Sequence, residues 1–93
     1  MRSAAEWRDF WRERGERELR LLLWAAWDPI TGASLSEYDE CTTRVATLLG
    51  SRASCEALVA ELGRIRTGEL GLDADPASDE RAAAKISRWF AAA

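Results

Sequence analysis

The feature that most constrains the fold is an uncharged apolar run from Leu21 to Trp27, the longest in the chain. It extends a helical pattern that begins at Glu16 and repeats apolar residues every three or four positions. Its main stripe consists of Leu19, Leu22, Leu23 and Ala26, and Leu21, Trp24 and Trp27 widen it. Because this segment is apolar around most of its circumference, we expect it to be the central helix. Asp28-Pro29 should end it, since a residue before proline is pushed out of the α region.

An amphipathic helix precedes this segment. It begins after Ser3 and places Trp7, Phe10, Trp11 and Arg14 at helical spacing. Gly15 costs about 1 kcal/mol relative to Ala inside a helix. The sequence therefore predicts either two helices or one helix bent at Gly15.

Three more helical patterns follow a loop from Pro29 to Ser36. We expect the first to begin at an N-cap Ser36 and to have Gly50 as its C-cap, the second to begin at Ser54, and the third to begin at Asp75 with Pro76 in its first position. Their inward residues are Tyr38, Cys41, Val45, Leu48 and Leu49, then Cys55, Leu58, Val59, Leu62 and Ile65, then Ala82 or Ala83, Ile86, Trp89 and Phe90. Leu70 and Leu72 should pin the intervening loop to the core.

No stretch alternates apolar and polar residues with a period of two, so no strand is expected. A chain of 93 residues is too short for two stable cores. We therefore predict an all-α bundle of four or five helices in a single domain, 1–93. Within it, residues 1–15 form a Trp-rich N-terminal helix and residues 16–93 form the helical core.

Composition excludes several classes of function. The chain has no His, and its net charge of −3 argues against nucleic acid as a partner, because phosphate binding needs a basic surface. We expect no membrane association, because no run is long enough to span a bilayer and no helix has a polybasic face. No signal sequence is recognisable, so a cytoplasmic location with Cys41 and Cys55 as buried, reduced thiols is expected. Two Cys without His do not make a zinc site, and no metal or cofactor is predicted.

Three short segments resemble a family of small bacterial proteins, the YugE-like domains of unknown function. The first reads Trp27-Asp28-Pro29-Ile30-Thr31-Gly32, which is one residue longer before Gly than the W-D-P-I-G loop of the family. The second is Ser36-Glu37-Tyr38-Asp39, against D-E-Y-D in the family, and the third is Leu48-Leu49-Gly50-Ser51-Arg52-Ala53-Ser54, against an L-L-x-x-x-A-S hinge. The match covers residues 19–67. It implies a small helical fold and no particular activity.

Acidic residues gather in two segments, 28–40 and 69–80, that contain no basic residue. We expect Asp28, Glu37 and Asp39 in the first segment and Asp73 and Asp75 in the second to meet a basic protein partner. A carboxylate site for Ca²⁺ or Mg²⁺ at 28–40 is the less favoured alternative, because the spacing is not that of an EF-hand. Tyr38 is expected to pack, since an ordinary tyrosine pKa near 10 suits acid catalysis poorly.

The stripe of Trp7, Phe10 and Trp11 is the second candidate site. It can complete the core, serve as a protein interface (an anchor in a partner's groove or a self-association surface), or lie on a membrane surface, in that order of preference. No base is placed to activate a Ser, Thr or Cys nucleophile, so no enzyme is predicted. The sequence thus favours a bacterial protein-binding domain, such as an immunity-type or antitoxin-type inhibitor. The alternative is a homo-oligomeric structural domain.

Overall fold

A computed structural model describes residues 3–27 and 34–93 of the chain. These ranges contain five α-helices: α1 Ala4–Phe10, α2 Glu16–Leu22, α3 Asp39–Gly50, α4 Cys55–Arg64 and α5 Pro76–Ala92. Three π-helical turns join or extend them, at Trp11–Gly15, Leu23–Trp27 and Ile65–Glu69, and a 3₁₀ turn at Leu35–Tyr38 precedes α3. The described ranges contain no strand. The predicted all-α fold is confirmed.

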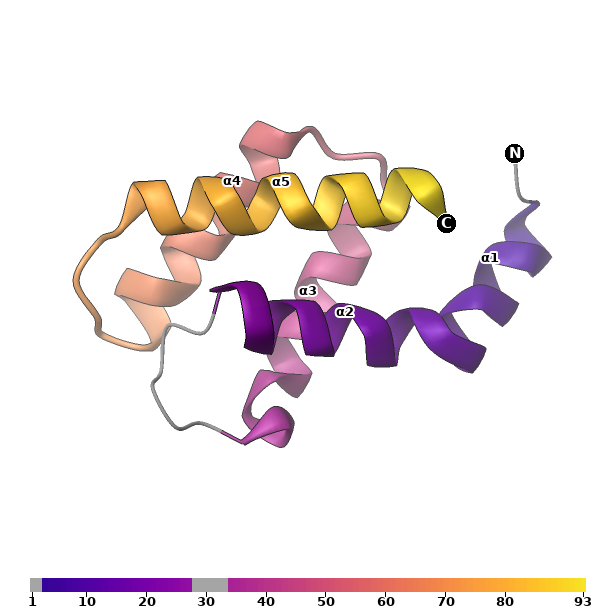
Figure 1. Cartoon of the computed structure of the whole chain (residues 1–93), viewed down its shortest axis with the longest axis horizontal. Coiled ribbons are helices and arrows are strands. Elements are labelled where there is room, and N and C mark those ends of the chain that lie inside the picture. The colour runs from indigo at the N-terminus through magenta and orange to yellow at the C-terminus, as the bar shows by residue number, and fades with distance from the viewer. Residues whose placement is uncertain (1–2, 28–33) are drawn as a thin grey trace.

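The first two helices form one continuous helix. Phe10, Trp11, Gly15 and Glu16 all have right-handed helical backbone angles, so the chain does not break between α1 and α2. Figure 1 shows the pair as one bent ribbon whose α1 end projects beyond the C-terminal end of α5. Of the two alternatives that the sequence left open, the single bent helix is observed.

Gly15 is buried inside this helix, and two rings explain why it is glycine. A Cβ atom at this position would lie 2.5 Å from Cε2 of Phe10 and 2.7 Å from Cε3 of Trp11. Carbon atoms do not approach so closely without displacement. Gly15 therefore lets both aromatic rings fold back over the π-helical turn.

One core unites the helices. α5 packs along α4 and α2, and α3 packs on α2 and α4 (Figure 1). The fully buried side chains include Leu19, Leu23, Tyr38, Val45, Leu58, Leu62, Ile65, Ala82, Ala83 and Ile86. All ten lie on stripes that the periodicity predicted. No helix in the described part of the chain combines the length and apolarity that a membrane span requires.

We expected the apolar run at the end of the first helix to be covered on most sides, as in a central helix. The structure covers it on one side only. Leu23 and Trp27 are buried, but Leu21 is 43% exposed and Trp24 is 42% exposed. The helix contacts α3 and α5 on one side only, and its other face meets solvent. In the loop before α5, Leu70 packs on the core, whereas Leu72 is exposed. The predicted packing of this loop is therefore confirmed for Leu70 and wrong for Leu72.

Three of the predicted caps are confirmed. Ser3 caps α1 in a capping box with Glu6, Ser54 accepts from the Ala57 N–H, and Asp75 caps α5 with Pro76 at its first position. Two are wrong. Ser36 lies inside a 3₁₀ turn that begins after Ser34, which is the actual cap. Gly50 is the last residue of α3, and the left-handed position that ends the helix is taken by Arg52, with φ of 59°.

Candidate functional site: an aromatic groove

Five aromatic rings from the two ends of the chain meet where α1 crosses the last turns of α5. Trp7 stacks on Phe90 with ring centroids 4.9 Å apart, Phe10 lies 5.8 Å from Trp89, and Trp11 contacts both rings of α5. Phe10 is 3% exposed, whereas Trp7 and Trp11 are only half-buried. The preferred alternative, packing, therefore accounts for Phe10 fully. Trp7 and Trp11 each keep an open edge.

These open edges border a groove of about 1060 Å³. One wall is a stripe on the first helix at positions i, i+3, i+4 and i+7, namely Ala4, Trp7 and Arg8 on α1 and Trp11 at the start of the π-helical turn after it. The remaining lining residues are Leu49 and Gly50 at the end of α3, Arg52 just after it, Phe90, Ala91 and Ala93 at the end of α5, and Glu6. We call this feature the aromatic groove.

The charges around the aromatic groove have both signs. Arg8 and Arg52 supply cations, and Glu6 supplies a carboxylate whose Oε1 also accepts a hydrogen bond of 3.1 Å from the Ser3 backbone N–H. The floor between them is formed by aromatic rings and small apolar side chains. Such a surface suits an apolar chain segment flanked by charges better than it suits a polyanion.

A hydrogen bond from α5 fixes the rings against the first helix. Trp89 Nε1 donates to Glu18 Oε1 over 2.9 Å, and the other oxygen of Glu18 lies 3.2 Å from Arg14 Nε. The Trp89 ring is thereby held against the first helix at a defined position. The groove is thus built on rigid elements.

The first acidic segment is largely engaged within the chain. Glu37 Oε2 accepts from the Ser34 backbone N–H at 2.7 Å, which caps the 3₁₀ turn, and Asp39 lies 2.8 Å from Arg20 Nε. Asp28 lies outside the described residues. Tyr38 is buried against Trp27, as expected for a packed ring. The structure therefore gives Glu37 a capping role in its own turn and Asp39 an ion pair with α2.

The second acidic segment is engaged even more. Asp75 caps α5 through a 3.2 Å hydrogen bond from the Ser78 backbone N–H, Glu69 pairs with Arg44, and Asp79 is buried. Within the described part of the chain, Asp73 and Glu80 are exposed without a polar partner. Together with Glu40 of the first segment, which is also exposed, these side chains make up what remains of the predicted acidic surface in the described ranges, because the other described carboxylates stabilise helix ends and helix contacts.

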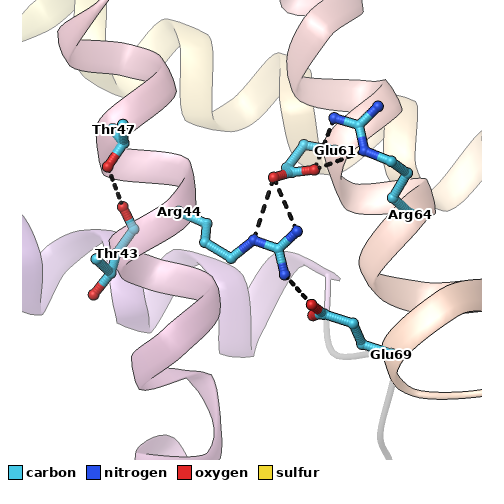
Figure 2. A network of polar contacts seen from close by, with 6 residues as sticks. All are labelled: Thr43, Arg44, Thr47, Glu61, Arg64 and Glu69. Atoms are coloured by element: carbon cyan, nitrogen blue, oxygen red, sulfur yellow. Dashed lines mark hydrogen bonds and ion pairs between the residues drawn. The ribbon is translucent and has the colours of Figure 1, made fainter.

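Arg44 and Glu61 lie at the centre of a charged network between α3 and α4 (Figure 2). Arg44 Nε donates to Glu61 Oε1 over 3.3 Å, and Arg64 Nε donates to Glu61 Oε2 over 3.0 Å. A hydrogen bond to Glu69 raises the pKa of the Arg44 guanidinium. On the neighbouring turns of α3, Thr47 bonds back to the Thr43 carbonyl. The network ties helices together and leaves no free carboxylate pair.

A second polar cluster is buried at the other end of the first helix. Asp79 Oδ1 accepts from Trp27 Nε1 at 2.7 Å and from Arg66 Nε at 3.1 Å, and all three residues are at most 6% exposed. The Arg66 guanidinium also lies 5.7 Å from the Trp27 ring. We call these residues the buried triad. Trp27 is thus fixed in the core by a hydrogen bond as well as by packing.

The two thiols differ, contrary to the expectation that both are buried. Cys41 is buried, and desolvation followed by the nearby Glu69 carboxylate raises its pKa, so the thiol stays protonated. Cys55 is exposed because it is the first residue of α4, before the helix reaches the core. Residues 3–27 and 34–93 contain no group of three or more His, Cys, Asp or Glu side chains arranged for a metal ion.

We compared the chain with protein-family models, with curated proteins and with solved structures, and none of them matched. The aromatic groove is therefore interpreted from its own geometry.

Proposed function

We propose that the protein is a non-enzymatic interaction domain that binds another protein chain in the aromatic groove. The observation that carries the proposal is the stripe of Trp7, Arg8 and Trp11, which lines the groove from the projecting first helix, although Trp11 also packs against the core. Half-exposed Trp beside Arg is the composition that dominates binding energy in protein interfaces. A groove walled by helices suits an amphipathic helix, which can place its apolar face on the rings.

A finer proposal is that the domain acts as an immunity-type or antitoxin-type inhibitor of a basic partner. Its support is the exposed pair Asp73 and Glu80, which lie around the start of α5, at the other end from the groove. Two carboxylates accelerate association more than they tighten binding. A bacterial source, a cytoplasmic location and the YugE-like resemblance stay predictions alongside it.

Site-specific crosslinking in cells of the source organism tests the groove. A photo-reactive amino acid replaces Arg8, which lines the groove, and in a matched variant it replaces Arg12, which lies on the same helix and pairs with Asp9 outside the groove. We expect a discrete crosslinked protein from position 8 only. Calorimetry with that purified protein should then show at least tenfold weaker binding to Trp7→Ala. Equal crosslinking at both positions, or no crosslink at position 8, would refute the proposal.

The finer proposal has its own test once a basic partner is in hand. Asp73→Lys should slow association at low salt and leave dissociation nearly unchanged, as stopped-flow fluorescence can measure. Asp75 is unsuitable for this purpose, because its replacement would also remove the cap of α5. An unchanged association rate would argue against electrostatic steering by this segment.

A further inference from the structure

We infer that the aromatic groove is covered by a second copy of this chain, with the two α1 helices packed antiparallel around a twofold axis. The inference rests on the proposed function, that the groove binds a protein chain, and it names that chain. Three observations carry it: the shape of α1, the order of residues along its inner stripe, and the signs of the surrounding charges.

The shape of α1 makes it both a wall and a candidate occupant. Figure 1 shows α1 extending past the end of α5, away from the rest of the bundle. The rings of Trp7 and Phe10 join it to α5, while Ala4 and Arg8 face the open groove. An occupant that fits beside a helix of this kind is a second helix, whose width with side chains is about 10–12 Å. Another copy of the chain presents such a helix in the same projecting position.

The inner stripe is self-complementary when read in opposite directions. With the twofold axis between Trp7 and Arg8, each Trp7 lies opposite the Arg8 of the other copy. Ala4 then lies opposite Trp11, so a small side chain faces a large one. A guanidinium over an indole face is a favourable pair, and symmetry makes this pair occur twice.

The charges around the groove also fit a twofold contact. Such a contact places a surface against itself, so a patch of one sign would repel its copy. The groove instead combines Arg8 and Arg52 with Glu6. The exposed acids Asp73 and Glu80 lie around the beginning of α5, and the groove lies at its end (Figure 1). These two carboxylates therefore lie away from the contact.

The exposed pair Leu21 and Trp24, on α2 and the π-helical turn that follows it, is the competing surface for self-association. It lies outside the groove. Association through that face would depend on Trp24 and would not respond to Arg8. The two surfaces are therefore separable by substitution.

Sedimentation equilibrium of the purified chain, from low to high micromolar concentration, tests the inference. We expect a monomer–dimer equilibrium for the unaltered chain. Arg8→Glu and Trp7→Ala should each raise the dimer dissociation constant about tenfold or more, because each removes both symmetric contacts. Arg12→Glu makes the same charge change outside the groove and should leave it unchanged. Circular dichroism checks that the variants fold, which is expected because Arg8 and Arg12 are exposed.

Two results would overturn the inference. One is an unaltered chain that stays monomeric over the whole range. The other is a dimer that Arg8→Glu does not weaken, and if Trp24→Ser weakens it, the contact lies on the face of Leu21 and Trp24. Either result leaves the proposed function intact if the photo-reactive residue at position 8 crosslinks to a different protein. If that position crosslinks to nothing, the proposed function fails as well.

Discussion

The tryptophans at the two ends of the first helix differ in how completely they are buried. At the C-terminal end, Trp27 is buried, and its indole N–H is paired with the carboxylate of Asp79. At the N-terminal end, Trp7 and Trp11 meet other aromatic rings and leave an edge toward the groove. The first end is fully committed to the fold. The second contributes to the fold and also keeps surface for binding.

The largest expected effect tests this difference directly. Trp27→Ala removes a buried ring and the hydrogen bond to Asp79, so we expect a loss of about 3–5 kcal/mol in the free energy of unfolding. Trp7→Ala removes a half-buried ring and should cost about 1 kcal/mol. Urea denaturation of both variants measures the contrast. Equal losses would mean that the two ends of the helix contribute alike to stability.

Asp79 sharpens the comparison because it holds the buried triad together. Asp79→Ala leaves the Arg66 guanidinium buried without a counter-charge, and we expect a cost of about 3 kcal/mol. One nitrogen of that guanidinium, Nη2, already has no hydrogen-bond partner. The double variant Arg66→Met, Asp79→Leu should recover most of the loss, since it replaces both charges with apolar groups. Asp73→Ala is the exposed control and should stay within about 0.5 kcal/mol of the unaltered chain. Thermal denaturation can rank all three, and a double variant no more stable than Asp79→Ala would contradict the argument.

The helices were predictable because their signals are local. Periodic apolar residues gave the core stripes, and Ser3, Ser54 and Asp75-Pro76 gave three helix starts. These signals need only neighbours within four or five positions of the chain. The stripe of Trp7, Phe10 and Trp11 was visible for the same reason, although its partner helix was not.

The fate of Glu69 and Asp79 was not predictable, because their partners are far away in sequence. Asp79 bonds Trp27 across 52 positions, and Glu69 bonds Arg44 across 25. A run of acids without neighbouring bases therefore looked free, although the fold supplies the bases. The same limit applies to Leu21 and Trp24, since helical periodicity does not show which side of a wholly apolar helix has a neighbour.

Gly15 tests how tightly the groove end is built. Alanine favours helices by about 1 kcal/mol over glycine, so a sequence argument predicts that Gly15→Ala stabilises the chain. The Phe10 and Trp11 rings leave no room for a Cβ, and we expect a loss of about 1–3 kcal/mol instead. Gly50→Ala is the matched control, because no atom lies within 4 Å of its added Cβ. Urea denaturation gives the sign of each change. A stabilised Gly15→Ala chain would show that the rings reorient easily and that the groove end is loosely packed.

The smallest effect concerns Arg52, which ends α3 and lines the groove. The N–H groups of Arg52 and Ala53 donate to the carbonyls of Leu49 and Leu48, each over 3.0 Å, and this closing pattern needs a left-handed residue at position 52. Glycine adopts that conformation more readily than any other residue. Arg52→Gly should therefore be more stable than Arg52→Ala by about 1 kcal/mol, because both lack the side chain and differ only at the strained backbone.

The comparison with the unaltered chain then isolates what the arginine side chain contributes. If the glycine variant is more stable than the unaltered chain and still weakens dimer formation, the arginine side chain at position 52 serves binding at the expense of the fold. That result would extend the contrast between the two ends of the molecule from tryptophan to arginine, since Arg66 serves the buried triad and Arg52 the groove.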